Sequence, residues 1–187
     1  KPEQIENLFD SLMKGYPISS MLFWKVRDEA KSSYRFYKVL DSYVEWHRIH
    51  NDAINTNQSN DFWAILDGQQ RLTSLYIALC GTYAKHRYRA RKENTETNFP
   101  TRRLYLNISK TLVADDDDKT YDFRFLVHNE RLFVDGDNCK WFKVGEIYNV
   151  TTTNYDVDDF ADDEKLSRDE KRMVNMLKKG SMGQIAG

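Results

Sequence analysis

The sequence has only two cysteines, Cys80 and Cys139, and no apolar run near the roughly 20 residues that span a bilayer. Two cysteines cannot build a disulfide framework, so a disulfide-rich miniprotein is excluded and a reducing cytoplasm is the expected location. Eight glycines in 187 residues exclude a collagen-like chain. Residues 1–15 are amphipathic and acidic and do not resemble a signal peptide. We therefore expect a cytoplasmic protein that has no contact with a membrane.

Aromatic residues are abundant by contrast, at 13% of the chain, within a hydrophobic total of 40%. Disordered chains are poor in residues that bury large surfaces, so this composition indicates a folded protein. A chain of 187 residues is long enough for one domain with a hydrophobic core and hardly long enough for two. We expect a single domain.

The net charge of −1 hides a gradient along the chain. Residues 1–103 hold 16 Lys and Arg against 12 Asp and Glu, whereas residues 104–187 hold 12 against 17. The basic excess is highest in residues 85–92, and the acidic excess is highest in residues 115–118 and 156–164. Such asymmetry permits a polyanion to bind one side of the molecule without requiring it.

Hydrophobic periodicity predicts alternating helices and strands. The predicted helices cover residues 2–14, 34–47, 72–79 and 165–179. The predicted strands cover residues 21–25, 62–66, 104–108 and 121–127, with a hairpin over 131–144 and loops over 51–60 and 94–103. The continuous apolar run of residues 62–66 is typical of a buried strand.

The best-defined local feature is the junction that follows this apolar run. The residues Asp67-Gly68-Gln69-Gln70-Arg71 separate it from a helical pattern, which predicts a strand, a tight glycine turn and a helix. Unpaired backbone N–H groups and the positive end of the helix dipole make a helix N-terminus an anion site, for phosphate above all.

Each residue of the junction has a chemical role and a purely structural one. Gly68 lets backbone approach a ligand closely, Arg71 can bind phosphate oxygens through two N–H groups, and the two glutamines add neutral donors. Asp67 would be a helix cap, a Mg²⁺ ligand or a base that orients water. In the purely structural interpretation, no ligand binds. Asp67 would then cap the helix, Gly68 would make a tight turn and Arg71 would pair with a surface carboxylate.

Two blocks of the sequence resemble a known family. Residues 66–76, LDGQQRLTSLY, resemble the DGQQR signature of the N-terminal domain of GmrSD-type, modification-dependent restriction endonucleases. Residues 5–18, IENLFDSLMKGYPI, resemble the segment that precedes this signature. The two blocks stand in the family's order and are separated by a variable insert, which is more specific than either block. Residues 121–126 and 141–144 also stand where the family has strands.

The resemblance implies a mixed α/β (α+β) fold, with helices around a small mixed sheet and a nucleotide-binding core similar to ParB and sulfiredoxin. It implies an NTP and Mg²⁺ site, without saying which nucleotide binds. In that site Asp67 and Arg71 are catalytic, and Asp67 is the metal ligand. The nucleotide contacts come from Gly68, Gln69, Gln70, Arg71, Thr73 and Ser74.

The implied function is a nucleotide-binding and NTP-hydrolysing, regulatory or DNA-sensing domain of a modification-dependent anti-phage restriction system. DNA cleavage would need a separate HNH-type nuclease domain or subunit. The family also has an upstream Pro-x-x-Gln-Arg…Trp segment and a downstream Phe-x-x-x-Asn segment that this sequence does not contain, so we expect the domain over residues 1–187 to be truncated at both ends. Gln69 stands where sulfiredoxin has its catalytic cysteine, which excludes sulfinic-acid repair.

A basic cluster supports an alternative function, a non-enzymatic ParB-like DNA-binding module. Its cations are Lys85, Arg87, Arg89, Arg91 and Lys92, with Tyr88 available to stack on a base. The same residues are also explained as the solvated end of a helix. In a third interpretation, the protein is an interaction scaffold and the DGQQR residues only start a helix.

Other conspicuous residues receive structural interpretations. His47 and His50 lack a third ligand at useful spacing, so we do not predict a metal site there. The two acidic runs match no EF-hand pattern and are expected to be solvated loops. The aromatic residues Tyr16, Trp24, Trp46, Trp63 and Trp141 are expected in the core or at its rim rather than as stacking platforms.

Overall fold

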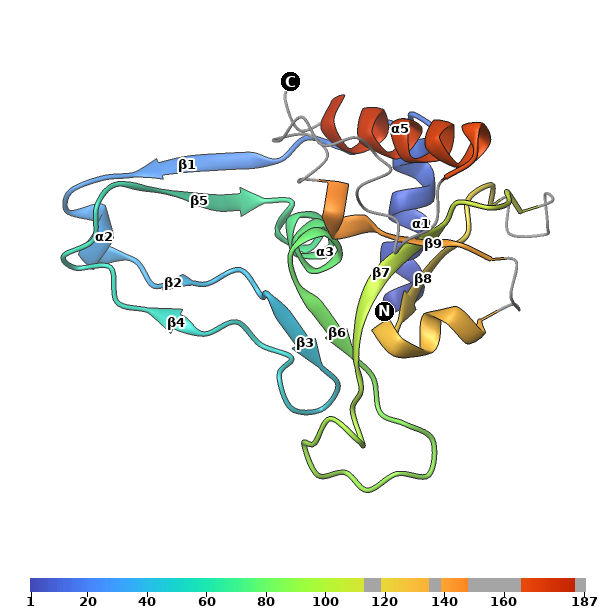
Figure 1. Cartoon of the computed structure of the whole chain (residues 1–187). Coiled ribbons are helices and arrows are strands. Elements are labelled where there is room, and N and C mark those ends of the chain that lie inside the picture. The colour runs from blue at the N-terminus through green and yellow to red at the C-terminus, as the bar shows by residue number, and fades with distance from the viewer. Residues whose placement is uncertain (113–118, 135–138, 148–165, 184–187) are drawn as a thin grey trace.

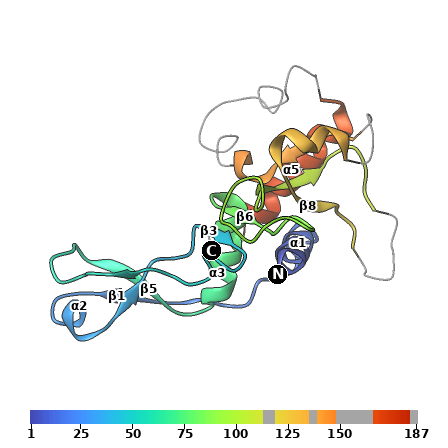
Figure 2. The same ribbon diagram turned by 90° about the horizontal axis from the view of Figure 1, so that it is seen from below.

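The computed structural model describes residues 1–112, 119–134, 139–147 and 166–183, which form a mixed α+β fold as the sequence predicts. Three helices, α1 (Pro2–Met13), α3 (Gln69–Leu79) and α5 (Arg168–Gly183), surround a small sheet. Two narrow ribbons of strands extend from this body and form an arm (Figure 1). Figure 2 shows the same arm reaching away from the helices when the molecule is seen from below.

The sheet of the body is built around one central strand, β7 (Thr101–Asn107). This strand pairs antiparallel with β6 (Thr82–Ala84), β8 (Phe123–Leu126) and β9 (Trp141–Lys143), while β3 (Ser42–Val44) joins β6 in parallel. Both faces of a central strand are covered, and residues 104–106 are accordingly almost completely buried. Two 3-10 helices, η1 (His128–Phe133) and η2 (Val144–Glu146), flank β8 and β9.

Helix α1 confirms the helix predicted at the N-terminus. Ile5, Phe9 and Leu12 recur at helical spacing and are buried in the core. Asp10 is also buried, and its Oδ1 accepts hydrogen bonds from the backbone N–H groups of Thr120 and Tyr121 at 3.0 and 2.8 Å. The helix therefore holds a segment that lies more than a hundred residues away in the chain.

The arm consists of two antiparallel ribbons joined by the short helix α2 (Ala30–Ser33). The first ribbon pairs β1 (Leu22–Val26) with β5 (Phe62–Asp67), and the second pairs β2 (Phe36–Tyr37) with β4 (Ala53–Ile54). At the tip, Lys31 Nζ lies 2.8 Å from Asp61 Oδ1 and donates a hydrogen bond to the Ser59 carbonyl oxygen at 3.0 Å.

Three predictions for residues 34–66 are wrong in whole or in part. The helix predicted over residues 34–47 is absent, and β2, β3 and a turn with Trp46 at φ +65° stand in its place. Its aromatic residues suit strand pairing, and the pairing with distant segments overrides the helical spacing. The strand β5 is confirmed, but it is not buried: Trp63 is 64% exposed, because a two-stranded ribbon has no second layer over its outer face. The loop predicted over residues 51–60 contains the short strand β4.

The C-terminal part is predicted in outline. The strands over residues 104–108 and 121–127 and the helix over 165–179 are confirmed by β7, β8 and α5. The hairpin over residues 131–144 is wrong, because residues 131–133 belong to η1 and β9 pairs with β7. The expected turn at 135–138 and the acidic runs 115–118 and 156–164 lie outside the described residues.

Candidate functional site

The predicted junction between strand, glycine turn and helix is present at the root of the arm. Strand β5 ends at Asp67, Gly68 adopts the left-handed conformation with φ +81°, and α3 begins at Gln69. A Cβ atom at position 68 would lie 2.8 Å from Met21 Cγ and 3.1 Å from Arg71 Nη2. Both the backbone angle and the lack of space therefore require glycine here.

The N-terminus of α3 is not capped by a side chain, as far as the described part of the chain shows. The sequence offered Asp67 as the cap, but its side chain is 75% exposed and makes no such hydrogen bond. The first N–H groups of a helix have no partner within the helix. The turn therefore presents free N–H groups next to an exposed carboxylate.

Arg71 leans back across the turn. Its Nη2 donates a hydrogen bond to the Ser20 carbonyl oxygen at 2.7 Å and lies 3.8 Å from Asp67 Oδ2. Its Nε is shielded from solvent and has no hydrogen-bond partner among the residues that the structure describes. A shielded N–H group without a partner costs free energy, so Arg71 is held in this position at some cost to stability.

The remaining predicted nucleotide contacts point in different directions. Gln70 is exposed, and the Ser74 hydroxyl donates to the Gln70 carbonyl oxygen at 2.8 Å within the helix. Gln69 Nε2 donates to the Ile65 carbonyl oxygen at 3.0 Å. Gln69 and Thr73 both line a cavity between the two ribbons. The structure thus brings Asp67, Gly68 and Arg71 together, and it turns Gln69 and Thr73 toward the arm.

This cavity, which we call the arm cavity, is a site feature that sequence reasoning missed. Its volume is about 460 Å³, and its walls include Trp24, Tyr34, Phe36 and Phe62. Trp24 was expected in the core or at its rim, and the wrongly predicted helix concealed the positions of Tyr34 and Phe36. A signal was present in the sequence, because the segments on either side of the polar loop 51–60 are rich in aromatic residues.

The basic cluster lies in a different place. It forms the loop between β6 and β7, at the end of β6 away from α3, so its interpretation as a helix end is wrong (Figure 1). Arg87 Nη2 donates to Glu130 Oε1 at 3.0 Å, the Arg89 guanidinium lies over the Tyr88 ring at 5.1 Å, and Lys92 Nζ lies over Trp46 at 5.1 Å. Lys85 and Arg91 are exposed.

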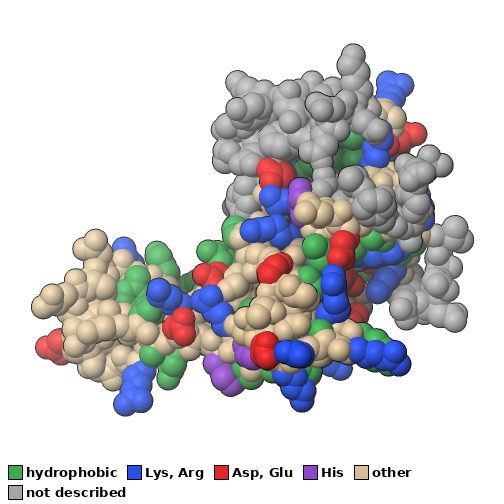
Figure 3. All heavy atoms as spheres, turned by 60° about the horizontal axis from the view of Figure 1, so that its bottom comes forward, with side chains coloured by type: hydrophobic (Ala, Val, Ile, Leu, Met, Phe, Trp, Pro, Cys, Tyr) green, Lys and Arg blue, Asp and Glu red, His purple; other side chains and the backbone are tan. Residues whose placement is uncertain are grey.

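Lys and Arg side chains are interspersed with Asp and Glu on the face seen in Figure 3, and they do not form a continuous basic surface there.

His47, in the turn after β3, places its Nε2 at 2.9 Å from the Lys92 carbonyl oxygen. No group of three or more His, Cys, Asp or Glu side chains is arranged to hold a metal ion within the described residues. In that same part of the chain, no helix is both long and apolar enough to cross a membrane.

The model of the family described as GmrSD restriction endonuclease, N-terminal domain, matches residues 1–178. No curated protein matches the chain.

Proposed function

Because the chain belongs to the GmrSD restriction endonuclease N-terminal domain family, we propose that it is the nucleotide-binding, DNA-sensing domain of a modification-dependent anti-phage restriction system. In this proposal it binds an NTP with Mg²⁺ and hydrolyses it, and a separate HNH-type nuclease domain or subunit cleaves DNA.

The uncapped start of α3 is the observation that carries the proposal. Free N–H groups and the positive end of the helix dipole favour phosphate, and Gly68 leaves no side chain between the backbone and a ligand. Arg71 stands in the first turn of the helix and adds positive charge. Its exposed N–H groups that Ser20 does not use would donate to phosphate oxygens.

Asp67 fits the role of Mg²⁺ ligand. Mg²⁺ commonly keeps several waters and is held by one or two carboxylates together with nucleotide phosphates. Asp67 supplies one exposed carboxylate at the end of β5, directly before the turn. Bound Mg²⁺ would neutralise phosphate charge and so favour hydrolysis, while Asp67 would also orient the attacking water.

Thermal-shift measurements with ATP, GTP, CTP and UTP in the presence of Mg²⁺ test the proposal. A ligand at about 100 times its dissociation constant adds nearly 3 kcal/mol to the free energy of unfolding and raises the melting temperature. We expect this rise in the wild type, a reduced rise in Arg71→Lys, and none in Arg71→Ala. Arg48→Ala is the control, since Arg48 is an exposed arginine that pairs with Asp41 in the arm.

Phosphate release measured on the same samples tests hydrolysis, which Asp67→Asn should abolish. If no nucleotide raises the melting temperature of the wild type, the nucleotide site is disproved. If Arg71→Ala lowers stability but alters no ligand, the DGQQR residues serve only the fold, as in the scaffold interpretation.

The ParB-like DNA-binding module is the second candidate function. It is favoured by the loop of residues 85–92, in which Tyr88 is 82% exposed and available to stack on a base. A DNA affinity that falls steeply with salt and does not respond to nucleotide would support this module over the nucleotide-dependent domain.

A further inference from the structure

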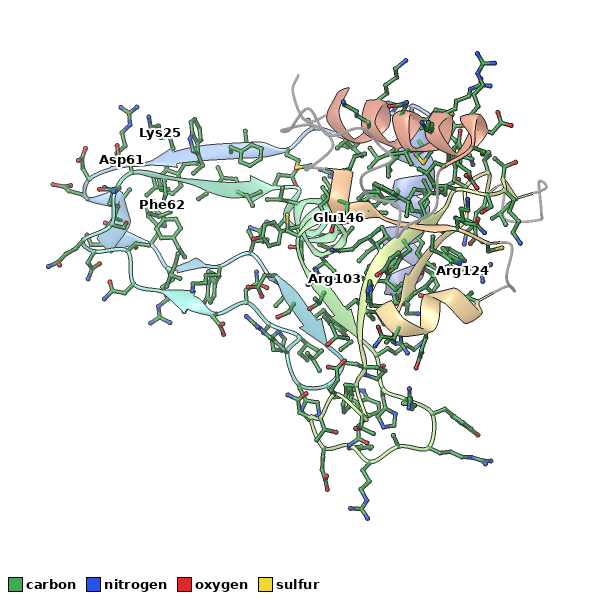
Figure 4. The ribbon with its side chains drawn as sticks, viewed as in Figure 1. Lys25, Asp61, Phe62, Arg103, Arg124 and Glu146 are labelled. Atoms are coloured by element: carbon green, nitrogen blue, oxygen red, sulfur yellow. The ribbon has the colours of Figure 1, made fainter. Side chains whose placement is uncertain are left out.

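The two faces of the first ribbon differ in what they contact. Paired residues of neighbouring strands share a face, so Trp24 and Ala64 lie on one side and Lys25 and Trp63 on the other. Figure 4 shows Phe62 pointing from β5 toward the second ribbon and Lys25 pointing away from it. The inner face therefore lines the arm cavity, whereas Lys25 and Trp63 on the outer face are exposed, and Trp63 also borders the cavity.

Four aromatic rings form a connected cluster along the cavity wall. The ring centroids are 5.4 Å apart for Trp24 and Tyr34, 6.1 Å for Trp24 and Phe36, and 4.9 Å for Phe36 and Phe62. None of the four belongs to the buried core, and Tyr34 is largely exposed. The cavity volume of about 460 Å³ is in the range of about 300–1,000 Å³ that is usual for small-molecule sites.

Two charged residues line the arm cavity, and both are cations. Arg35 and Lys38 line it, and no aspartate or glutamate of the described residues does. Aromatic walls and a cationic margin are complementary to a flat ring that is attached to an anion. An uncharged apolar peptide would make no use of these two cations.

We propose that the arm cavity binds the base of the nucleotide whose phosphates bind at the Gly68 turn, an inference that rests on the proposed function. Gln69 and Thr73 connect the two places, since they stand in the first turns of α3 after Gly68 and also line the cavity. One nucleoside triphosphate thus lies with its phosphates at the start of the helix and its base between the ribbons. Stacking on aromatic rings tolerates every base, so the four nucleotides bind with similar affinity.

Titration calorimetry with Mg²⁺ and either ATP or inorganic triphosphate tests this inference. Stacking of one base corresponds to an affinity gain of about 5- to 150-fold, so ATP should bind the wild type more tightly than triphosphate by that factor. Trp24→Leu should remove most of this gain and leave the affinity for triphosphate unchanged. Trp24→Phe keeps a ring and should keep most of the gain. Phe23→Leu is the matched control, because Phe23 is an exposed aromatic residue of the same strand that does not line the cavity, and it should behave as the wild type.

Tryptophan fluorescence gives a second measurement that does not depend on the stability of the leucine variant. ATP should quench the fluorescence of Trp46→Phe, which lacks an exposed tryptophan that does not line the cavity, as strongly as that of the wild type, and it should quench Trp24→Phe less. Two results would overturn the inference: equal affinity of the wild type for ATP and triphosphate, or an equal loss of affinity for both ligands in Trp24→Leu. Triphosphate binding by the wild type would still support the proposed phosphate site. If neither ligand binds the wild type, the proposed function fails together with the inference.

Discussion

Arg71 donates a hydrogen bond from Nη2 to the backbone carbonyl oxygen of Ser20, a residue 51 positions earlier in the chain, at 2.7 Å. This bond fastens the segment that leads into β1 to the first turn of α3. The same guanidinium lies 3.8 Å from the Asp67 carboxylate, so the two proposed catalytic side chains and the start of the arm meet at one point. A ligand at the turn would therefore act on residues that also position the arm.

The turn itself is sensitive to a single methyl group. We expect Gly68→Ala to lower the free energy of unfolding by about 1–2 kcal/mol for the left-handed backbone, with a further loss from the contact with Met21. Gly15→Ala is a matched control, because Gly15 has the same φ of +81° and nothing lies within 4 Å of an added Cβ. Urea unfolding of both variants measures the difference. Equal losses would show that the space at Gly68 is not limiting.

Asp10 is expected to stabilise the body through the hydrogen bonds it accepts. Asp10→Ala leaves the N–H groups of Thr120 and Tyr121 without this partner and should cost about 2–4 kcal/mol. Asn7→Ala, at an exposed position on the same helix, should change stability by about 0.5 kcal/mol or less. Chemical denaturation compares the two. A cost for Asp10→Ala no larger than that of Asn7→Ala would contradict this role.

Glu6 should make stability depend on pH. Burial raises the pKa of the Glu6 carboxyl above its usual range, although the hydrogen bond from the Phe125 N–H opposes part of this effect. The contribution of such a group is fully present below its unfolded pKa and is lost as pH rises through the raised folded pKa.

Glu6→Gln removes this titration and keeps an oxygen that accepts the Phe125 hydrogen bond. The variant should therefore gain stability relative to the wild type as pH rises from about 4 to about 7. Melting temperatures across this range provide the measurement, with Glu29→Gln as a control at an exposed glutamate that does not affect the Glu6 pKa. A difference between Glu6→Gln and wild type that stays constant with pH would refute the prediction.

The basic loop should contribute to DNA affinity through charge alone. Arg91→Ala and Lys85→Ala remove exposed cations, and each should lower the slope of log affinity against log salt by about 1, uniformly across DNA sequences. Arg172→Ala on α5 removes an exposed arginine at another place and should leave the slope unchanged. Fluorescence anisotropy at several salt concentrations measures these slopes. Unchanged slopes in both loop variants would place the DNA contact elsewhere.

Local sequence patterns predicted the features that depend on neighbouring residues. Helix α1 has its apolar residues at helical spacing, and the junction at Gly68 combines an apolar run, a glycine and a second helical pattern. The arm could not be predicted in this way, because β2 pairs with β4 and β1 with β5 across a long insert. Phe36 fits a helical pattern and a strand equally well, and only its contact with Phe62 decides between them. The arm cavity depends on these pairings and was missed for the same reason.

Strand β5 continues into α3 with one residue, Gly68, between them. No flexible linker stands between the ribbon and the helix. A movement of the ribbon is therefore passed through the glycine turn to the start of α3. A displacement at Asp61, directly before β5, is transmitted along a strand with five residues paired to β1, to the place where the phosphates are proposed to bind. The arm therefore connects whatever meets its tip to the proposed phosphate site at its root.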